Sequence, residues 1–239
     1  MSVESSNPAE EILREQQRYY SERAGEYDQW WFRQGRYDLG PSLNRVWFDE
    51  VAQLQRAFEL APLHGHVLEL AGGTGIWTQR LASRVQRLTV LDGSAEMISL
   101  NRARLEAAGL AERVSYRQVD LFAWRPARLY DAVFCGFWLS HVPVDRLDEF
   151  LQRVASAITT GGTLAVVDST RAADATVPNR QSPPEGVEIT TRRLSDGREF
   201  QIVKRFYERE ELRQLLMRHG FHADVETTSK YFVYAVARK

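Results

Sequence analysis

From His66 onward the chain alternates short apolar segments with helical patterns, and this alternation is the strongest constraint on the fold. The segments expected to be strands are residues 67–71, 87–91, 114–119, 130–136 and 163–167. Between them, helices are expected at residues 76–84, 94–108 and 144–158. Apolar strands that alternate with helices are typical of a parallel sheet covered on both faces. The sequence therefore predicts an α/β fold.

The pattern changes after Asp168. Residues 170–188 carry three prolines and few large apolar side chains, and a connection of this length favours a functional lid or a disordered segment. Two extended runs flank Ser195-Asp196-Gly197, which predicts a β-hairpin that pairs Arg192 with Phe200 and places Lys204 on the same face. A helix over 208–219 and antiparallel strands at 221–227 and 231–237 are expected to close the edge of the sheet.

The N-terminal region is rich in aromatic residues. A helix is expected to begin at Asn7-Pro8, because Asn caps helices well and Pro fits the first turn. An amphipathic helix is expected over 43–58, with its apolar stripe starting at Leu43 and Val46. We expect Tyr20, Trp47 and Phe48 to be packing core. We divide the chain into an N-terminal helical lid (1–60) and a larger domain (61–239) with a lid hairpin at about 187–206.

Composition excludes several classes of protein. Lys and Arg number 31 against 32 Asp and Glu, so the basic excess of a nucleic-acid-binding protein is absent. No apolar run approaches the ~18 residues of a membrane span, and the N-terminus lacks the features of a signal peptide. The single cysteine, Cys135, cannot form an internal disulfide. We therefore expect a cytoplasmic monomer or homodimer that binds a small molecule, with no nucleic-acid or membrane partner.

A glycine-rich turn, from Ala71 to Gly75, follows the first strand and opens the next helix. Missing side chains in such a turn let a ligand approach backbone N–H groups. Asp92 ends the following strand, where a carboxylate can hold both hydroxyls of a ribose. Two residues disagree with a dinucleotide site: Thr78 replaces its third glycine, and Glu69 would repel a pyrophosphate but not a cationic sulfonium amino acid.

With these residues the sequence resembles the class I S-adenosylmethionine (SAM)-dependent methyltransferases, over nearly the whole chain. Residues 69–75 are similar to their first motif, with Ala71 where many members have glycine, and 92–97, 119–122 and 130–138 are similar to three further motifs in order. The resemblance implies a seven-stranded Rossmann-like sheet, SAM as cofactor and S-adenosylhomocysteine (SAH) as product. No metal site is predicted, and a divalent metal stays open. The implied cofactor-binding residues are Tyr27, Glu69, Ala71, Gly73, Gly75, Asp92, Gly93, Met97, Asp120, Leu121 and Phe137.

A closer resemblance is to small-molecule O-methyltransferases. It is carried by residues 19–28, by residues 138–143, and by Arg192 with Lys204. One similar branch methylates phosphonates, and the other caps a mannoside hydroxyl in methylmannose polysaccharide synthesis. We expect a sugar hydroxyl as the acceptor, with a phosphonate or carboxylate oxygen as the alternative. The expected substrate-binding residues are Arg36, Tyr37, Arg192 and Lys204, of which the last two match positions that hold the acidic group in the phosphonate branch.

His141 is the expected catalytic residue, because it follows the fourth strand at the edge where parallel sheets bind their ligands. It can act as a general base or as an orienting group, since the ordinary pKa of histidine lies near neutrality. Three alternatives stay open: a nicotinamide oxidoreductase, disfavoured by Thr78 and Glu69; a non-catalytic SAM-binding module; and a quinone-type C-methyltransferase.

Overall fold

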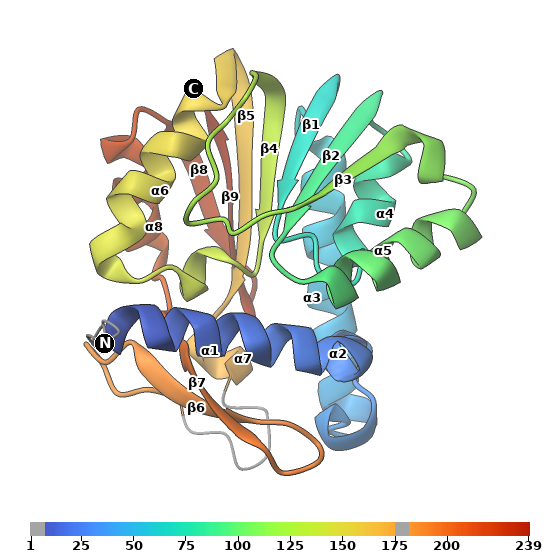
Figure 1. The fold of residues 1–239 in the computed structure, drawn as a ribbon, viewed down its shortest axis with the longest axis vertical. Helices are drawn as coiled ribbons and strands as arrows, with labels where there is room; N and C mark the ends of the chain where they lie inside the picture. The colour runs from blue at the N-terminus through green and yellow to red at the C-terminus, as the bar shows by residue number, and fades with distance from the viewer. Residues whose placement is uncertain (1–7, 175–181) are drawn as a thin grey trace, which may run out of the picture.

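A single seven-stranded sheet forms the centre of the computed structural model, which describes residues 8–174 and 182–239 (Figure 1). The strand order is β3-β2-β1-β4-β5-β9-β8; β1 to β5 are parallel, and β9 runs antiparallel to both of its neighbours. This confirms the predicted fold class. The strands are β1 (His66–Leu70), β2 (Arg87–Asp92), β3 (Val114–Gln118), β4 (Tyr130–Gly136), β5 (Ile158–Ser169), β8 (His222–Thr227) and β9 (Phe232–Arg238).

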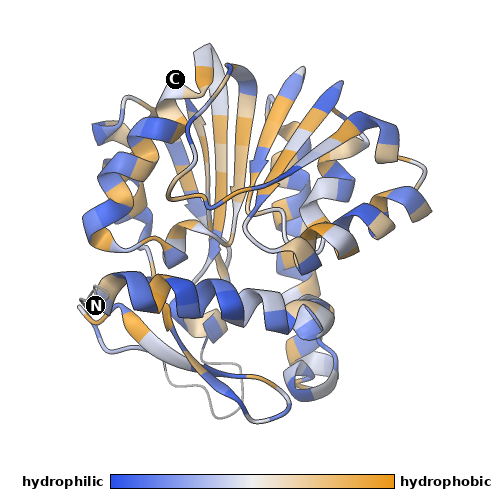
Figure 2. Cartoon of the chain, viewed as in Figure 1, coloured by the Kyte–Doolittle hydropathy of each residue, from blue (hydrophilic) through white to orange (hydrophobic). Residues whose placement is uncertain are grey.

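Helices cover both faces of the sheet, as strands that are apolar on both faces require. Successive strand residues point to opposite faces, so Val67 packs in one hydrophobic cluster and Leu68 in the other. Leu68 packs in the cluster of α6 (Val144–Ser156) and α8 (Arg209–Arg218), and Val67 in that of α3 (Pro41–Leu60), α4 (Ile76–Ala82) and α5 (Ala95–Ala107). Figure 2 shows hydrophobic residues concentrated in the central strands.

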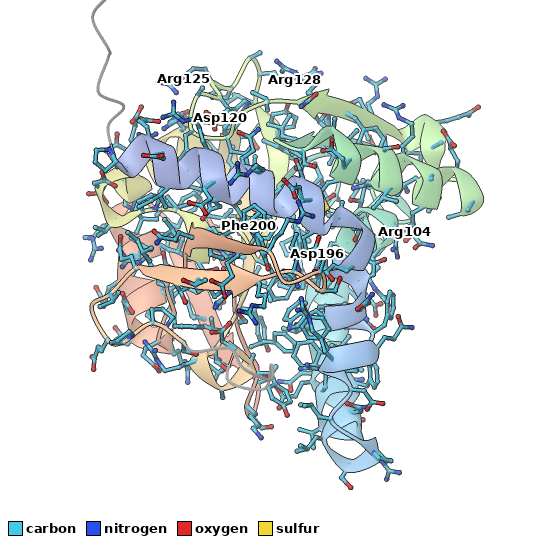
Figure 3. The ribbon with its side chains drawn as sticks, turned by 60° about the horizontal axis from the view of Figure 1, so that its bottom comes forward. Arg104, Asp120, Arg125, Arg128, Asp196 and Phe200 are labelled. Atoms are coloured by element: carbon cyan, nitrogen blue, oxygen red, sulfur yellow. The ribbon has the colours of Figure 1, made fainter. Side chains whose placement is uncertain are left out.

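The N-terminal helix α1 (Pro8–Arg23) crosses the sheet at the carboxyl ends of the parallel strands, and short α2 (Tyr27–Trp31) follows it (Figure 1). A separate hairpin of β6 (Ile189–Arg193) and β7 (Glu199–Val203) packs against α1, next to the four-residue α7 (Arg171–Asp174). Its register pairs Arg192 with Phe200, as predicted. Figure 3 shows this end of the molecule, and Phe200 packs with the ring of Tyr19 of α1 at 5.6 Å between centroids.

Some predicted boundaries differ from the structure. The helix predicted over 144–158 ends at Ser156, because β5 already begins at Ile158. Gly162 lies inside that strand, and a Cβ there would lie 2.7 Å from the backbone oxygen of Asp131. The strand can therefore approach β4 only with glycine at this position. Asn7, the predicted cap of α1, and part of the predicted lid 170–188 lie outside the described residues.

The amphipathic stripe of α3 was predicted too long. Leu43 and Val46 are exposed, because the sheet ends before the first turns of the helix. Phe48 was expected in the core and is also 43% exposed, whereas Trp47 is fully buried as expected. No helix of the described residues is long and apolar enough to cross a membrane.

A buried carboxylate joins α3 to the turn between β8 and β9. The two oxygens of Glu50 accept hydrogen bonds from the Thr228 hydroxyl, from the Ser229 hydroxyl at 2.6 Å and from the Tyr231 backbone N–H at 2.8 Å. All three donors come from the far end of the sequence. Glu50 therefore fixes the position of α3 relative to the edge of the sheet.

Glu50→Ala should lower the free energy of unfolding by about 1–3 kcal/mol, because it leaves buried donors without an acceptor. Urea unfolding followed by circular dichroism measures this change. Asp49→Ala, on the exposed side of the same helix, is the matched control. Equal stability of the two variants would contradict the structural role of Glu50.

Candidate functional site

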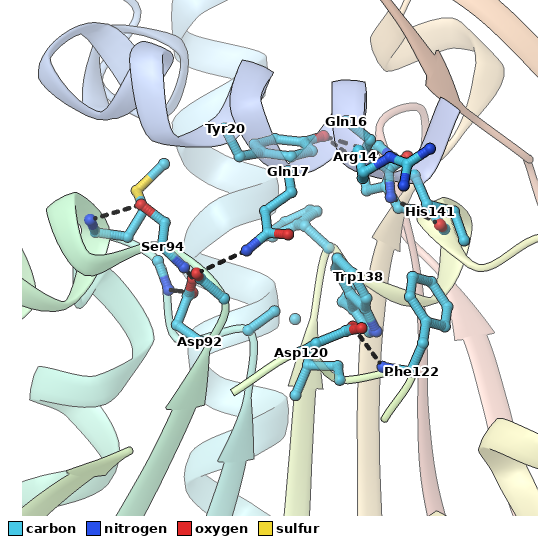
Figure 4. A pocket seen from close by; sticks show the side chains of 18 of the residues that line it. Arg14, Gln16, Gln17, Tyr20, Asp92, Ser94, Asp120, Phe122, Trp138 and His141 are labelled. Carbon is cyan, nitrogen blue, oxygen red and sulfur yellow. Dashed lines mark hydrogen bonds between the residues drawn. The ribbon is translucent and has the colours of Figure 1, made fainter. Parts of the chain in front are cut away.

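The carboxyl ends of the parallel strands and the underside of α1 enclose a cavity of about 920 Å³ (Figure 4). We call it the large cavity. Such an edge is where ligands bind in open α/β sheets. Nine of the eleven predicted cofactor residues line it, namely Tyr27, Ala71, Gly73, Asp92, Gly93, Met97, Asp120, Leu121 and Phe137.

The glycine-rich turn bends sharply under this cavity. Ala71, Gly73 and Gly75 all have positive φ angles, of 55°, 52° and 90°. The side chain of Asp92 holds the turn, since its Oδ2 accepts the Gly73 N–H and its Oδ1 accepts the Ser94 N–H, both at 2.9 Å. Burial raises the pKa of Asp92, and these hydrogen bonds oppose that rise. Gly75 caps α4 and does not line the cavity.

Glu69 lies beside a smaller cavity of about 370 Å³. We call this the tryptophan cavity, because Trp30, Trp31 and Trp77 line it. Glu69 is 2% exposed, and burial raises its pKa to about 8. Within the described residues, neither Glu69 Oε2 nor the Trp77 Nε1–H has a hydrogen-bond partner. The cavity therefore offers one acceptor and one donor to a ligand, and the acceptor favours a cation.

A third cavity, of about 490 Å³, lies on the far side of Tyr27 and Phe137, which line all three cavities. We call it the cationic cavity, because Arg23, Arg192 and Lys204 line it. Lys204 Nζ donates to Ser140 Oγ at 2.7 Å, to Ser169 Oγ at 3.0 Å and to Asp168 Oδ1 at 3.1 Å. Burial lowers the pKa of Lys204, and the Asp168 carboxylate opposes that shift.

His141 lies between the large and cationic cavities, in the short 3-10 turn η4 (Leu139–His141). Its Nδ1 lies 2.7 Å from the carbonyl oxygen of Val203, which can only accept, so Nδ1 carries the proton. Its Nε2 lies 2.7 Å from the hydroxyl of Tyr20, which then donates to it. Burial, followed by the charge of Lys204, lowers the pKa of His141 well below its usual value. His141 is therefore neutral, with both ring nitrogens engaged.

Helix α1 is held over the cavities by its glutamines. Gln16 donates to the carbonyl oxygen of His141 at 3.1 Å and accepts the Val203 N–H at 2.9 Å. Gln17 donates to the carbonyl oxygen of Gly93 at 3.0 Å (Figure 4). The side chain of Asp28, at the start of α2, accepts the Thr74 hydroxyl at 2.5 Å and so holds the glycine-rich turn. The lid therefore contacts the sheet, the turn and the hairpin at once.

Two predicted substrate residues lie outside all three cavities. Arg36 donates to Glu26 Oε1 at 3.2 Å and to the carbonyl oxygen of Arg193 at 3.1 Å, and so connects the lid to the hairpin. Tyr37 is fully buried behind it. Conversely, Tyr20 was expected as packing core, but it lines two cavities and binds His141. The sequence did not single out Gln16, Gln17 or Arg23, because a polar residue on a helix carries no signal of which partner it meets.

The described residues contain no group of three or more His, Cys, Asp or Glu side chains arranged to hold a metal ion.

Comparisons of the sequence and of the structure with known proteins both find methyltransferases. A family model described as a methyltransferase domain matches residues 67–162. The chain is 32% identical over 140 residues to the ubiquinone/menaquinone biosynthesis C-methyltransferase UbiE of Methylococcus capsulatus, covering 56% of this chain and 55% of that protein. It is 32% identical over 116 residues to the trans-aconitate 2-methyltransferase of Streptomyces avermitilis, covering 47% and 42%. The chain thus spans about half the length of the curated relatives it matches.

A solved structure, titled a DhpI–SAM–HEP complex, is similar over almost its whole length. It is 38% identical in sequence, has a TM-score of 0.76, and is aligned over 95% of this chain and 98% of its own. Together with the strand order and the glycine-rich turn, this similarity shows that the chain belongs to the class I SAM-dependent methyltransferases.

Proposed function

We propose that this chain transfers the methyl group of SAM to an oxygen of a small anionic acceptor bound in the cationic cavity. The observation that carries the proposal is the charge of that cavity. Three buried cations, Arg23, Arg192 and Lys204, face it, and among the described residues two carboxylates accompany them, Asp174 on its wall and Asp168 behind Lys204. Burying an unbalanced positive charge is costly unless an anion completes the site.

The other two cavities fit SAM. In the large cavity, Met97 and Leu121 offer apolar surface to an adenine, and Asp92 lies where ribose hydroxyls bind. In the tryptophan cavity, the free oxygen of Glu69 suits the ammonium group of the amino-acid end, and the free N–H of Trp77 suits its carboxylate. This fit supports SAM as the methyl donor.

The acceptor would meet the methyl group at Tyr27 and Phe137, the two side chains common to all three cavities. SAM supplies an electrophilic methyl carbon: the acceptor oxygen forms the new C–O bond while the C–S bond breaks and leaves its electron pair on sulfur. The protein's contribution is to hold oxygen, carbon and sulfur in line and to exclude water.

An anionic acceptor needs no general base, since its oxygen is already ionised. His141 suits this reaction better as an orienting group than as a base, because both of its nitrogens are occupied and its pKa is low. We propose that it fixes the hydroxyl of Tyr20, whose lone pairs stay available to a ligand at the boundary of the two cavities.

A mannoside hydroxyl is the second candidate acceptor. It is favoured by the rings of Tyr19, Tyr20, Tyr27 and Trp30 on the cavity wall, because such faces pack well against sugars. A neutral hydroxyl must lose its proton, however, and the imidazole beside it is already engaged. A non-catalytic SAM-binding module would bind the cofactor without transfer to either class of acceptor.

SAM-dependent methylation should occur with ethylphosphonate or propionate and not with methyl α-mannoside. SAH formation and the mass of the methylated product measure it. Methyl transfer to the mannoside alone would favour a sugar hydroxyl as the acceptor. SAH binding without methyl transfer to any of the three compounds would contradict an acceptor site for phosphonates, carboxylates and mannosides.

SAH binding should release a proton near pH 7. The raised pKa of Glu69, about 8, keeps the free carboxyl mostly protonated there, and the ligand's ammonium group favours its ionised form. The affinity for SAH should therefore rise between pH 6 and pH 8, by up to about tenfold per unit. Calorimetry in buffers of different ionisation enthalpy detects the released proton. Glu69→Gln should abolish the release, and exposed Glu106→Gln should leave it intact; a pH-independent affinity in the wild type would argue against the assignment.

The pH profile of kcat, at saturating SAM and acceptor, should show no acid limb near pH 6.5. The pKa of His141 is lowered, so the imidazole stays neutral from pH 6 to 8, and an ionised acceptor needs no base. A tenfold fall of kcat per pH unit below 6.5 that disappears in His141→Asn would instead identify His141 as the base.

A further inference from the structure

Arg23, at the end of α1, is a buried cation that has no acidic partner among residues 8–174 and 182–239. Arg23 is only 6% exposed, yet no carboxylate of the described residues lies within 4.0 Å of its guanidinium nitrogens. Its Nη2 donates a hydrogen bond to the hydroxyl of Tyr37 at 3.3 Å, and its Nε has no partner in the described part of the chain. Its guanidinium also lies 4.8 Å from the ring centre of Tyr27. A guanidinium has five N–H donors, so most of its capacity remains for a ligand.

The other two cations of the cavity are already engaged. The three hydrogen bonds of Lys204 to Ser140, Ser169 and Asp168 use all the N–H groups of its ammonium. Arg192 forms an ion pair of 2.9 Å with Asp174, and both side chains are 3% exposed. An incoming anion would have to displace a partner of Lys204, and at Arg192 it would share the guanidinium with Asp174. It would displace nothing at Arg23.

A second unpartnered group faces the same cavity. Tyr19, one turn before Arg23 on α1, is fully buried, and its hydroxyl has no hydrogen-bond partner among the described residues. Its ring is fixed by Tyr20 at 5.0 Å and Phe200 at 5.6 Å between centroids. Buried hydroxyl groups are rarely left unsatisfied, so this one also indicates an absent ligand.

We propose that Arg23 and Tyr19 bind the non-reacting oxygens of the acceptor, and that Arg23 is the residue that selects an anionic acceptor. This inference rests on the proposed function in one respect, namely that the acceptor occupies the cationic cavity. The ligand is an oxyacid with at least two oxygens, either a phosphonate or a carboxylate. One oxygen group meets Arg23 and Tyr19, and another faces Tyr20 and Phe137, which border the SAM-binding cavities.

The test is equilibrium binding of ethylphosphonate and of propionate to the SAH-saturated protein, residues 1–239, measured by calorimetry. Arg23→Gln should weaken the binding of the better anion about 10- to 100-fold, as expected for loss of a charge-assisted hydrogen bond. Arg23→Lys keeps the charge but loses the planar fork, and should lose less. Tyr19→Phe, which removes only the hydroxyl, should weaken binding about tenfold or less.

Arg18→Gln is the matched control. Arg18 lies on the same helix, and its side chain is 63% exposed. The substitution Arg18→Gln should therefore leave anion binding unchanged. The affinity for SAH should stay within about twofold of wild type in every variant, which separates loss of the anion site from loss of the fold. If Arg23→Gln does not fold, Arg23→Lys and Tyr19→Phe carry the test.

Unchanged anion affinity in the folded Arg23 and Tyr19 variants would overturn the proposal, and so would failure of both anions to bind the wild-type SAH complex. Anion binding that depends on Arg23 without methyl transfer would support the anion site while contradicting the proposed reaction. The relative affinities of phosphonate and carboxylate distinguish the two sources of negative charge.

Discussion

The side-chain amide of Gln16 is the interaction on which the site depends. It joins three parts of the chain that are far apart in sequence: α1, the turn that carries His141, and the hairpin strand that ends at Val203. Because the amide is buried and uses both its donor and its acceptor, no water can replace it without loss. The same contact closes the large cavity from above and brings Tyr19, Tyr20 and Arg23 to the wall of the cationic cavity. The lid is thus part of the site rather than a cover over it.

Two buried side chains with unused hydrogen-bonding capacity, one acidic and one basic, explain how the site suits methyl transfer. Glu69 offers the tryptophan cavity a carboxyl oxygen that ionises when a cation binds, and Arg23 offers the cationic cavity N–H donors. Tyr27, Trp30 and Phe137 separate the two cavities. Charged groups interact more strongly in a buried site than in bulk water, so each favours a ligand group of the opposite sign. In the proposed reaction, a methyl group passes from the cationic sulfonium of SAM to an anionic acceptor. Glu69 would bind the ammonium group of SAM and Arg23 the acceptor, so the two side chains would keep the reactants on opposite sides of Tyr27, Trp30 and Phe137.

The periodicity of the sequence predicted the sheet, the hairpin register and the cofactor turn, since these depend on local patterns. Glu69 and Asp92 were predicted from their places in and at the end of strands beside the glycine-rich turn and from the family resemblance, and both side chains lie beside cavities. Of the four predicted substrate residues, Arg192 and Lys204 line the cationic cavity and the other two do not. Arg36 and Tyr37 were chosen for their polarity and lie behind the wall, whereas Arg23 and Tyr20 line the cavity. Which polar residues of an aromatic helix face a cavity depends on how that helix crosses the sheet, and one sequence carries no local signal of this.

A crystal structure of the protein with SAH and ethylphosphonate tests the central claim most directly. The account predicts that the phosphonate lies in the cationic cavity, with one oxygen within 3.2 Å of Arg23 or Tyr19, as a hydrogen bond requires, and another directed at the sulfur across Tyr27 and Phe137. The ion pairs of Lys204 with Asp168 and of Arg192 with Asp174 should remain intact. A phosphonate that displaces either pair while Arg23 stays without a ligand would contradict it.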